Sequence, residues 1–153
     1  MNLQANILIN KRGHARLIDF GLSTILRPLL GQSHLAISCV RPGAIRYAAP
    51  ELVLSDNPAE LPLEKADIYS FGCIMLQALS GRLPWSEIWL GHLVARIAVK
   101  MSQGRGPQRP DGHPAIIDLD WDFIQRCLQF SPELRPSADE VLDFVMRRFS
   151  SSR

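Results

Sequence analysis

The stretch from Lys65 to Gly81, KADIYSFGCIMLQALSG, is apolar on nearly every side of a helix. It is too short and too interrupted to span a membrane, so we expect a central helix over 65–80 that the rest of the chain surrounds. Gly81 stands where a left-handed residue would end this helix, and Pro84 would prevent its resumption. Asp67 is the exception in the stretch, because a carboxylate in the first turn of a buried helix needs hydrogen-bond donors. We expect its side chain to be buried and to hold a backbone segment.

Length and composition predict a single globular domain. The chain has 153 residues, of which 46% are apolar and 21% are charged, as in ordinary soluble domains. The formal net charge is only +2, and interspersed charges of both signs argue against nucleic-acid binding. Cys39, Cys73 and Cys127 lack metal-ligand spacing and are expected to be reduced thiols of an intracellular, cytoplasmic protein. With no charged-then-apolar leader and no apolar run of about 18 residues, we expect neither secretion nor a membrane span.

The first part of the chain predicts a β-hairpin over 6–18. Two short runs of β-branched residues and leucine, 6–9 and 15–18, flank a loop that contains Gly13. An irregular span from Gly21 to about Tyr47 follows. A loop of this length in a compact domain is usually functional.

The remainder of the chain predicts helices. Besides the central helix we expect a short helix over 49–54 and amphipathic helices near 86–98, 119–129 and 138–149. Ser137 would cap the last of these, with Glu140 three residues on. Gly- and Pro-rich residues 103–114 are expected to form a loop. The tail, 150–153, is expected to be disordered.

The predicted hairpin also carries candidate metal ligands. Asn6 begins its first strand and Asp19 follows its second, so an amide oxygen and a carboxylate are presented on the same side. Such hard oxygen ligands suit Mg²⁺. Taken alone, the same two residues are weak evidence for a metal site and are better explained by a turn-capping role.

The order of four motifs indicates a family. Asp19-Phe20-Gly21, Ala49-Pro50-Glu51, Asp67-Ile68-Tyr69-Ser70-Phe71-Gly72 and Arg135-Pro136-Ser137 together resemble the second half of a eukaryotic-type protein kinase domain. The resemblance covers about residues 2–149. It implies a mainly α fold, the kinase C-lobe, with a helical subdomain around the 65–80 helix and a small hairpin. Residues 1–149 would then be a partial kinase domain.

The resemblance assigns roles to the hairpin residues. Asp19 resembles the Asp that chelates the Mg²⁺ bridging the ATP phosphates, and Asn6 resembles the catalytic-loop Asn that holds a second Mg²⁺. Phe20, followed by Gly21, resembles the residue whose packing distinguishes active from inactive states. ATP and Mg²⁺ are therefore the implied cofactors.

The resemblance also implies structural roles for three charged residues. Glu51 and Arg135 resemble a buried ion pair that ties the end of the activation segment to the helical subdomain. Asp67 resembles the helix carboxylate that accepts backbone hydrogen bonds from the catalytic loop.

The chain departs from the family where phosphate transfer takes place. The pattern H-R-D-L-x-x-x-N places the catalytic base five residues before the Asn, and that position is Met1. Leu3 stands where Ser/Thr kinases usually have Lys, and Ala44 stands where they have Thr. The Gly-rich loop and the phosphate-binding Lys would lie outside the chain.

Two hypotheses follow. The first is a protein kinase, of the Ser/Thr type according to Arg46-Tyr47-Ala48-Ala49-Pro50-Glu51, which acts on protein hydroxyls but is truncated here and inactive alone. The second is a non-catalytic kinase-like module, a pseudokinase that binds a partner protein. In either case the surface that faces the second lobe in the family would be exposed and would favour association.

Overall fold

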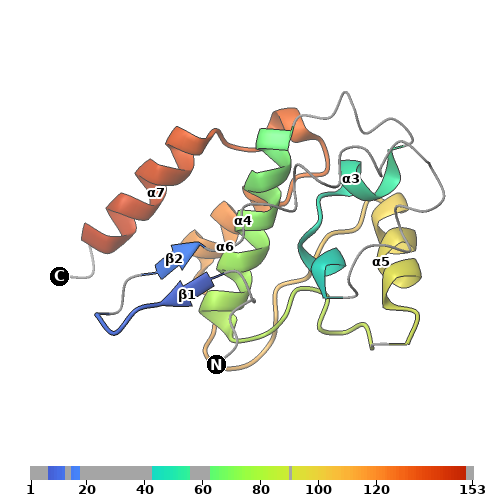
Figure 1. Ribbon diagram of the computed structural model, residues 1–153, viewed down its shortest axis with the longest axis horizontal. Coiled ribbons are helices and arrows are strands. Elements are labelled where there is room, and N and C mark those ends of the chain that lie inside the picture. Colours follow the sequence, from blue (N-terminus) through green and yellow to red (C-terminus); the bar gives the residue numbers. More distant parts are fainter. Residues whose placement is uncertain (1–6, 13–14, 18–42, 56–62, 90, 151–153) are drawn as a thin grey trace.

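The computed structural model describes residues 7–12, 15–17, 43–55, 63–89 and 91–150 (Figure 1). Within these ranges the fold is mainly helical, as predicted for a kinase C-lobe, with a small two-stranded sheet. The elements are β1 (Ile7–Ile9), β2 (Ala15–Leu17), the 3-10 helix η1 (Ala44–Tyr47), α3 (Pro50–Leu54), α4 (Leu63–Ser80), α5 (Leu93–Ser102), α6 (Asp118–Cys127), the 3-10 helix η3 (Pro132–Leu134) and α7 (Ala138–Ser150).

Helix α4 runs through the middle of the molecule, with α7 on one side and α3 and α5 on the other (Figure 1). One part of its surface, including Tyr69 and Cys73, packs in a core with residues of η1, α3 and α5. Another part, at Ile68, packs with α6 and α7. The predicted central helix is therefore confirmed. Gly81 follows its last residue with φ +69° and donates its N–H to the Gln77 carbonyl at 2.8 Å.

The prediction that Asp67 is buried in the first turn is wrong. Helix α4 begins at Leu63, so Asp67 lies beyond the first turn, and its side chain is exposed, as is that of Glu64. Residues three apart share one face of a helix, and the described elements leave this face uncovered. Partial desolvation still raises the pKa of the Asp67 carboxyl above its ordinary value.

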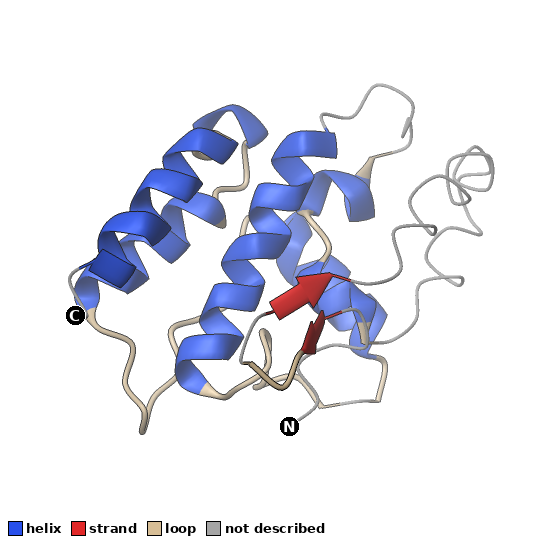
Figure 2. Cartoon of the chain, turned by 60° about the vertical axis from the view of Figure 1, so that its left-hand side comes forward, coloured by secondary structure: helices blue, strands red, loops and turns tan. Residues whose placement is uncertain are grey.

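The predicted hairpin is confirmed. Strands β1 and β2 are antiparallel, with Ile7 opposite Leu17 and Ile9 opposite Ala15. In the turn between them, the N–H of Arg12 donates to Asn10 Oδ1 at 2.9 Å. The chain therefore enters β1 and leaves β2 at the same end of the hairpin, which lies in front of the helices in Figure 2.

The helix predicted over 86–98 has the wrong bounds. Residues 84–87 form a turn, and α5 begins only at Leu93. Trp85 and His92 have φ values of +58° and +57°, which are incompatible with a continuous helix. Ile88, directly after this turn, is nevertheless buried, so its burial matches the apolar position that the helical pattern predicted. The short helix over 49–54 is present as α3, with Ala49 as its N-cap.

The two C-terminal helices are confirmed. Ser137 and Glu140 form the predicted reciprocal cap of α7: the Ser137 N–H donates to Glu140 Oε2 at 2.8 Å, and the Glu140 N–H donates to Ser137 Oγ at 3.2 Å. The rings of Phe123 and Phe144 stack at a centroid distance of 3.8 Å and join α6 to α7. Ser150 belongs to α7, so the predicted tail is wrong at this residue, while 151–153 lie outside the described ranges.

No helix in the described part of the chain has the length and apolar character needed to cross a bilayer.

Candidate functional site

The proposed metal ligands lie outside the described residues. Asn6 directly precedes β1 and Asp19 follows β2 by two positions, and Phe20 and Gly21 come next. Met1, Leu3 and the surface that would face a second lobe also lie in stretches for which the structure gives no side-chain description. Their roles remain those that the family resemblance implies.

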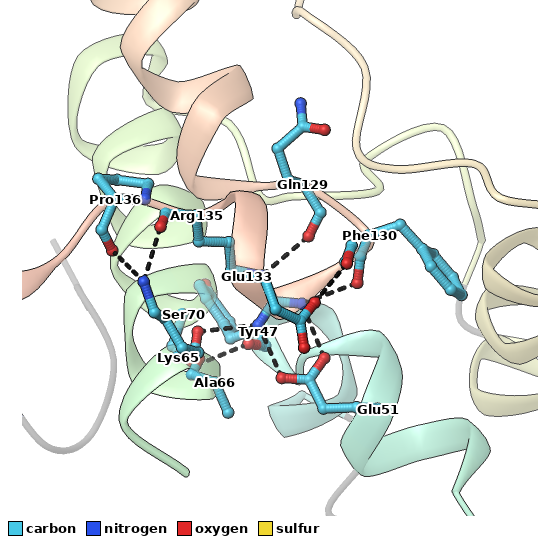
Figure 3. Close-up of polar contacts among 11 residues, drawn as sticks. Tyr47, Glu51, Lys65, Ala66, Ser70, Gln129, Phe130, Glu133, Arg135 and Pro136 are labelled. Atoms are coloured by element: carbon cyan, nitrogen blue, oxygen red, sulfur yellow. Dashed lines mark hydrogen bonds and ion pairs between the residues drawn. The ribbon is translucent and has the colours of Figure 1, made fainter. Parts of the chain in front are cut away.

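Glu51 and Arg135 meet in a bidentate ion pair (Figure 3). Arg135 Nη1 donates to Glu51 Oε1 at 2.7 Å, and Nη2 donates to Oε2, also at 2.7 Å. The Arg135 side chain is fully buried and that of Glu51 is 11% exposed. Glu51 lies in the first turn of α3 and Arg135 follows η3, so the pair joins segments 84 positions apart.

Arg135 also binds three backbone carbonyls. Its Nε donates to the Gln129 carbonyl at 2.8 Å, Nη1 to the Lys65 carbonyl at 2.8 Å and Nη2 to the Phe130 carbonyl at 3.1 Å. Its guanidinium carbon lies 5.2 Å from the centroid of the Tyr69 ring. One side chain thus connects α3, the start of α4 and the segment after α6.

Lys65, at the start of α4, also binds the segment that contains Arg135 (Figure 3). Its Nζ donates to the carbonyl of Arg135 at 2.8 Å and to that of Pro136 at 3.3 Å. Arg135 and Lys65 therefore each bind the backbone of the other's segment. This reciprocity fixes the backbone around the ion pair as well as the side chains.

The segment before α3 is anchored to α4. The Tyr47 hydroxyl donates to Gln77 Oε1 at 2.5 Å, and Ser70 Oγ donates to the Tyr47 carbonyl at 2.9 Å. Ile45 and Ala49 are buried in the same core. Gly43 and Ala44, at the beginning of the segment, are exposed.

The sequence interpretation missed Arg46. Its side chain is buried, and its guanidinium donates to the carbonyls of Pro84, Trp85 and Ile88. In the sequence, Arg46 stands in the motif that indicates the kinase subclass. The available signal for its burial is its position between two apolar residues, Ile45 and Tyr47.

The described part of the chain contains neither a metal-ligand cluster nor an activated cysteine. No group of three or more His, Cys, Asp or Glu side chains among them is arranged to hold a metal ion. Burial raises the pKa of the Cys127 thiol to about 12, and it raises the pKa of the Cys73 thiol still further. Both thiols are therefore protonated at neutral pH and are poor nucleophiles.

Comparison with known proteins identifies the family. The family profile described as protein kinase domain matches residues 4–145. The chain is 34% identical over 152 residues to mitogen-activated protein kinase kinase kinase 9 of Arabidopsis thaliana, with 97% of this chain covered and 18% of that protein. It is 32% identical over 150 residues to mitogen-activated protein kinase kinase kinase ANP1 of the same plant, with 97% of this chain and 21% of that protein covered.

A fungal relative gives the same result. The serine/threonine-protein kinase BCK1/SLK1/SSP31 of Saccharomyces cerevisiae is 29% identical over 137 residues, with 90% of this chain and 9% of that protein covered. The chain thus spans 9% to 21% of the length of these three relatives. The profile match, the order of the motifs and the buried Glu51–Arg135 pair agree: the chain belongs to the protein kinase family.

Proposed function

We propose that residues 1–149 supply the large-lobe part of a serine/threonine protein kinase domain, whose complete form transfers the γ-phosphoryl group of ATP to a hydroxyl of a protein inside the cell. The choice of serine and threonine is supported by the relatives, one of which is a serine/threonine-protein kinase. Several others are mitogen-activated protein kinase kinase kinases, which favours a protein kinase as the substrate.

The observation that carries this proposal is the buried Glu51–Arg135 pair. It ties α3, and with it the segment 43–49, to the helical body through charged groups that are almost fully removed from water. The family resemblance implies that such a pair ties the end of the activation segment to the helical subdomain. The rigid connection between these segments supports the assignment of the described residues to that subdomain.

ATP and Mg²⁺ are the cofactors of the proposed complete form. Asn6 and Asp19 would hold Mg²⁺, and an amide oxygen with a carboxylate is a donor set that suits this ion. The register of β1 and β2 supports the pairing, because the chain enters and leaves the hairpin at the same end. Bound there, the metal would neutralise charge on the phosphate groups.

These residues alone are not expected to transfer phosphate. Met1 occupies the position of the catalytic base, and Leu3 and Ala44 replace the polar groups that accompany it in Ser/Thr kinases. Ala44 is exposed at the start of η1 and offers only a methyl group.

The same three residues favour a second candidate, a non-catalytic module that binds a partner protein. Met1, Leu3 and Ala44 are apolar at three positions where the family has side chains that hydrogen-bond to one another. Their joint replacement is what a loss of phosphate transfer would produce. The intact Asn6 and Asp19 favour the kinase.

The test uses the protein that carries these residues, purified from its own cells with an antibody raised against the 153-residue chain. It is incubated with radiolabelled ATP, Mg²⁺ and myelin basic protein, and the labelled amino acids are identified. We expect phosphoserine and phosphothreonine, and their loss in protein from cells edited to Asp19→Ala. Absence of labelling, with an unchanged set of co-purified proteins in the Asp19→Ala cells, would favour the non-catalytic module.

A further inference from the structure

Tyr69 ends in a buried hydroxyl that no described residue satisfies. The residue is 1% exposed, and its phenolic oxygen has no hydrogen-bond partner within the described ranges. Burial raises the pKa of the Tyr69 phenol well above its ordinary value, so the group is an O–H donor at neutral pH. A buried donor without an acceptor destabilises a fold. Tyr47 is the contrast, because its hydroxyl donates to Gln77 Oε1 at 2.5 Å.

The same tyrosine lines a pocket. This pocket, with a volume of about 330 Å³, lies where α3, α4, α6 and the loop 104–108 meet. Pro50 comes from α3 and Tyr69 from α4, while Trp121 and Gln125 come from one face of α6. Small-molecule sites in proteins have volumes of roughly 300–1,000 Å³, so this pocket is large enough for a small ligand.

The loop on one side of the pocket is fixed to α5. The Gly104 N–H donates to the Met101 carbonyl at 2.8 Å, and the Arg105 N–H donates to the Lys100 carbonyl at 3.0 Å. Both bonds join the start of the loop to the last turn of the helix. A wall that is held by backbone hydrogen bonds is preorganised, which lowers the conformational cost of binding.

The donors around the pocket favour an anion. Arg105 is the charged side chain among the described lining residues, and no carboxylate is among them. None of the ion pairs formed in the described part of the chain includes Arg105. A guanidinium and a phenolic O–H both donate, so the complementary ligand offers a negatively charged oxygen. Trp121, Leu128 and Phe130 add apolar surface to the lining, which favours an apolar body on the ligand.

We propose that this pocket binds a small organic acid, whose carboxylate accepts hydrogen bonds from the Tyr69 hydroxyl and the Arg105 guanidinium. The flat apolar body of the acid packs against Trp121 and Phe130. One guanidinium balances one negative charge, so a monocarboxylate fits better than a doubly charged phosphate. The small volume suits a free molecule better than an extended polypeptide. The proposal does not depend on phosphate transfer.

Titration of the isotope-labelled 153-residue chain with phenylacetate, followed by NMR, tests the site. We expect amide shifts at 104–108 and 125–130, and about tenfold weaker binding of phenylacetamide, which lacks the charge. Tyr69→Phe removes only the hydroxyl and should weaken phenylacetate binding about tenfold. Arg105→Met should weaken it about threefold, because Arg105 is exposed. The matched control is Arg96→Met, at an exposed arginine outside the pocket, which should leave the affinity unchanged.

Thermal unfolding without a probe separates this role from a structural one. Tyr69→Phe deletes an unsatisfied group, so it should unfold at the same temperature as the unchanged chain or above it. Tyr47→Phe loses a hydrogen bond and should unfold about 2–4 °C lower. If Tyr69→Phe were destabilised as much as Tyr47→Phe, the hydroxyl would have a structural partner and the proposal would be overturned.

Three binding results would also overturn it: equal affinity for phenylacetate and phenylacetamide, unchanged affinity in Tyr69→Phe, or no shift at 104–108 with millimolar phenylacetate. If Tyr69→Phe does not fold, Arg105→Met and the phenylacetamide comparison decide. A tetrapeptide that ends in phenylalanine presents a similar acid on a chain. Tighter binding of this peptide than of phenylacetate would overturn the assignment to a free small molecule.

Discussion

At the scale of single residues, Arg135 joins three segments of the chain through one buried side chain. It makes five hydrogen bonds, two to Glu51 and three to backbone carbonyls. Its planar fork suits this set, whereas a lysine ammonium could not reach acceptors in so many directions. The junction of α3, α4 and the segment after α6 therefore depends on one buried cation and its carboxylate partner.

Removing that carboxylate should be costly. We expect Glu51→Ala to lower the free energy of unfolding by about 3–5 kcal/mol, because Arg135 would be left as a buried charge without its counter-ion. Asp67→Asn should change it by about 0.5 kcal/mol or less, since Asp67 is exposed. Urea unfolding of both variants measures the difference. If Asp67→Asn were the more damaging change, the exposed position of Asp67 would be wrong.

The two buried thiols predict a loss of stability at alkaline pH. Burial raises the pKa of Cys127 to about 12 and raises that of Cys73 as well, while thiols of an unfolded chain ionise near pH 8.5. Below that pH both states are protonated and the contribution is complete. As the pH rises from about 8.5 to 10, only the unfolded state loses protons, so stability falls by roughly 1–2 kcal/mol per thiol.

Urea unfolding at pH 8 and at pH 10 checks this expectation. The double variant Cys73→Ala/Cys127→Ala should be less stable at pH 8 but should lose less stability on going to pH 10. Equal losses in the two proteins would show that the thiols are accessible to base in the folded state.

Sequence reasoning found some of these residues and missed others for a physical reason. Glu51 and Arg135 each stand in a short motif, so the family resemblance implied their pairing. Arg46 was missed because its burial is set by carbonyls 38 to 42 positions away, which no local pattern contains. Asp67 was expected to be buried because it lies among apolar neighbours, but the stripe that it shares with Glu64 is uncovered in the described part of the chain.

At the scale of elements, α4 and α6 approach closely at Gly72. A Cβ added to Gly72 would lie 2.7 Å from Cys127 Cβ and 3.2 Å from Leu128 Cδ2. Glycine inside a helix normally weakens it by about 1 kcal/mol relative to alanine. Here the absent side chain is what allows the two helices to pack.

Gly72→Ala should therefore destabilise the protein by about 1–3 kcal/mol, against the usual gain in helix propensity. Gly106→Ala is the matched control, because a Cβ there would meet nothing within 4 Å. We expect the control to shift the free energy of unfolding by about 0.5 kcal/mol or less. Thermal or urea unfolding separates the two; a Gly72→Ala variant as stable as the control would contradict the close packing of α4 and α6.

Element boundaries were predictable where local signals were strong. Gly81 ends α4, and Ser137 with Glu140 begins α7, because both signals act within a single turn of helix. The predicted start of α5 is too early because Ile88, which is buried, lies before the helix. Apolar residues at helical spacing give the same sequence pattern whether or not the backbone between them is helical. The positive φ of Trp85 and His92 could not be read from their residue types.

At the scale of the whole molecule, the described residues form a helical platform. Helix α4 is its centre. The segment 43–51 is held to α4 by the Tyr47 contacts, to the 84–88 segment by the Arg46 hydrogen bonds, and to the residue after η3 by the Glu51–Arg135 pair. Chemistry in this family depends on groups from both lobes. These 153 residues bear the helical part of a protein kinase domain, and we propose that they do not transfer phosphate alone.

The most direct test is a transfer assay with the purified 153-residue chain, radiolabelled ATP, Mg²⁺ and myelin basic protein. We predict no labelling above that of an Asp19→Ala variant, because the family resemblance would put Met1 at the position of the base and Leu3 and Ala44 at those of its polar companions. Loss of such groups removes many decades of rate. Labelling of the substrate by the unchanged chain that disappears in Asp19→Ala would contradict the account.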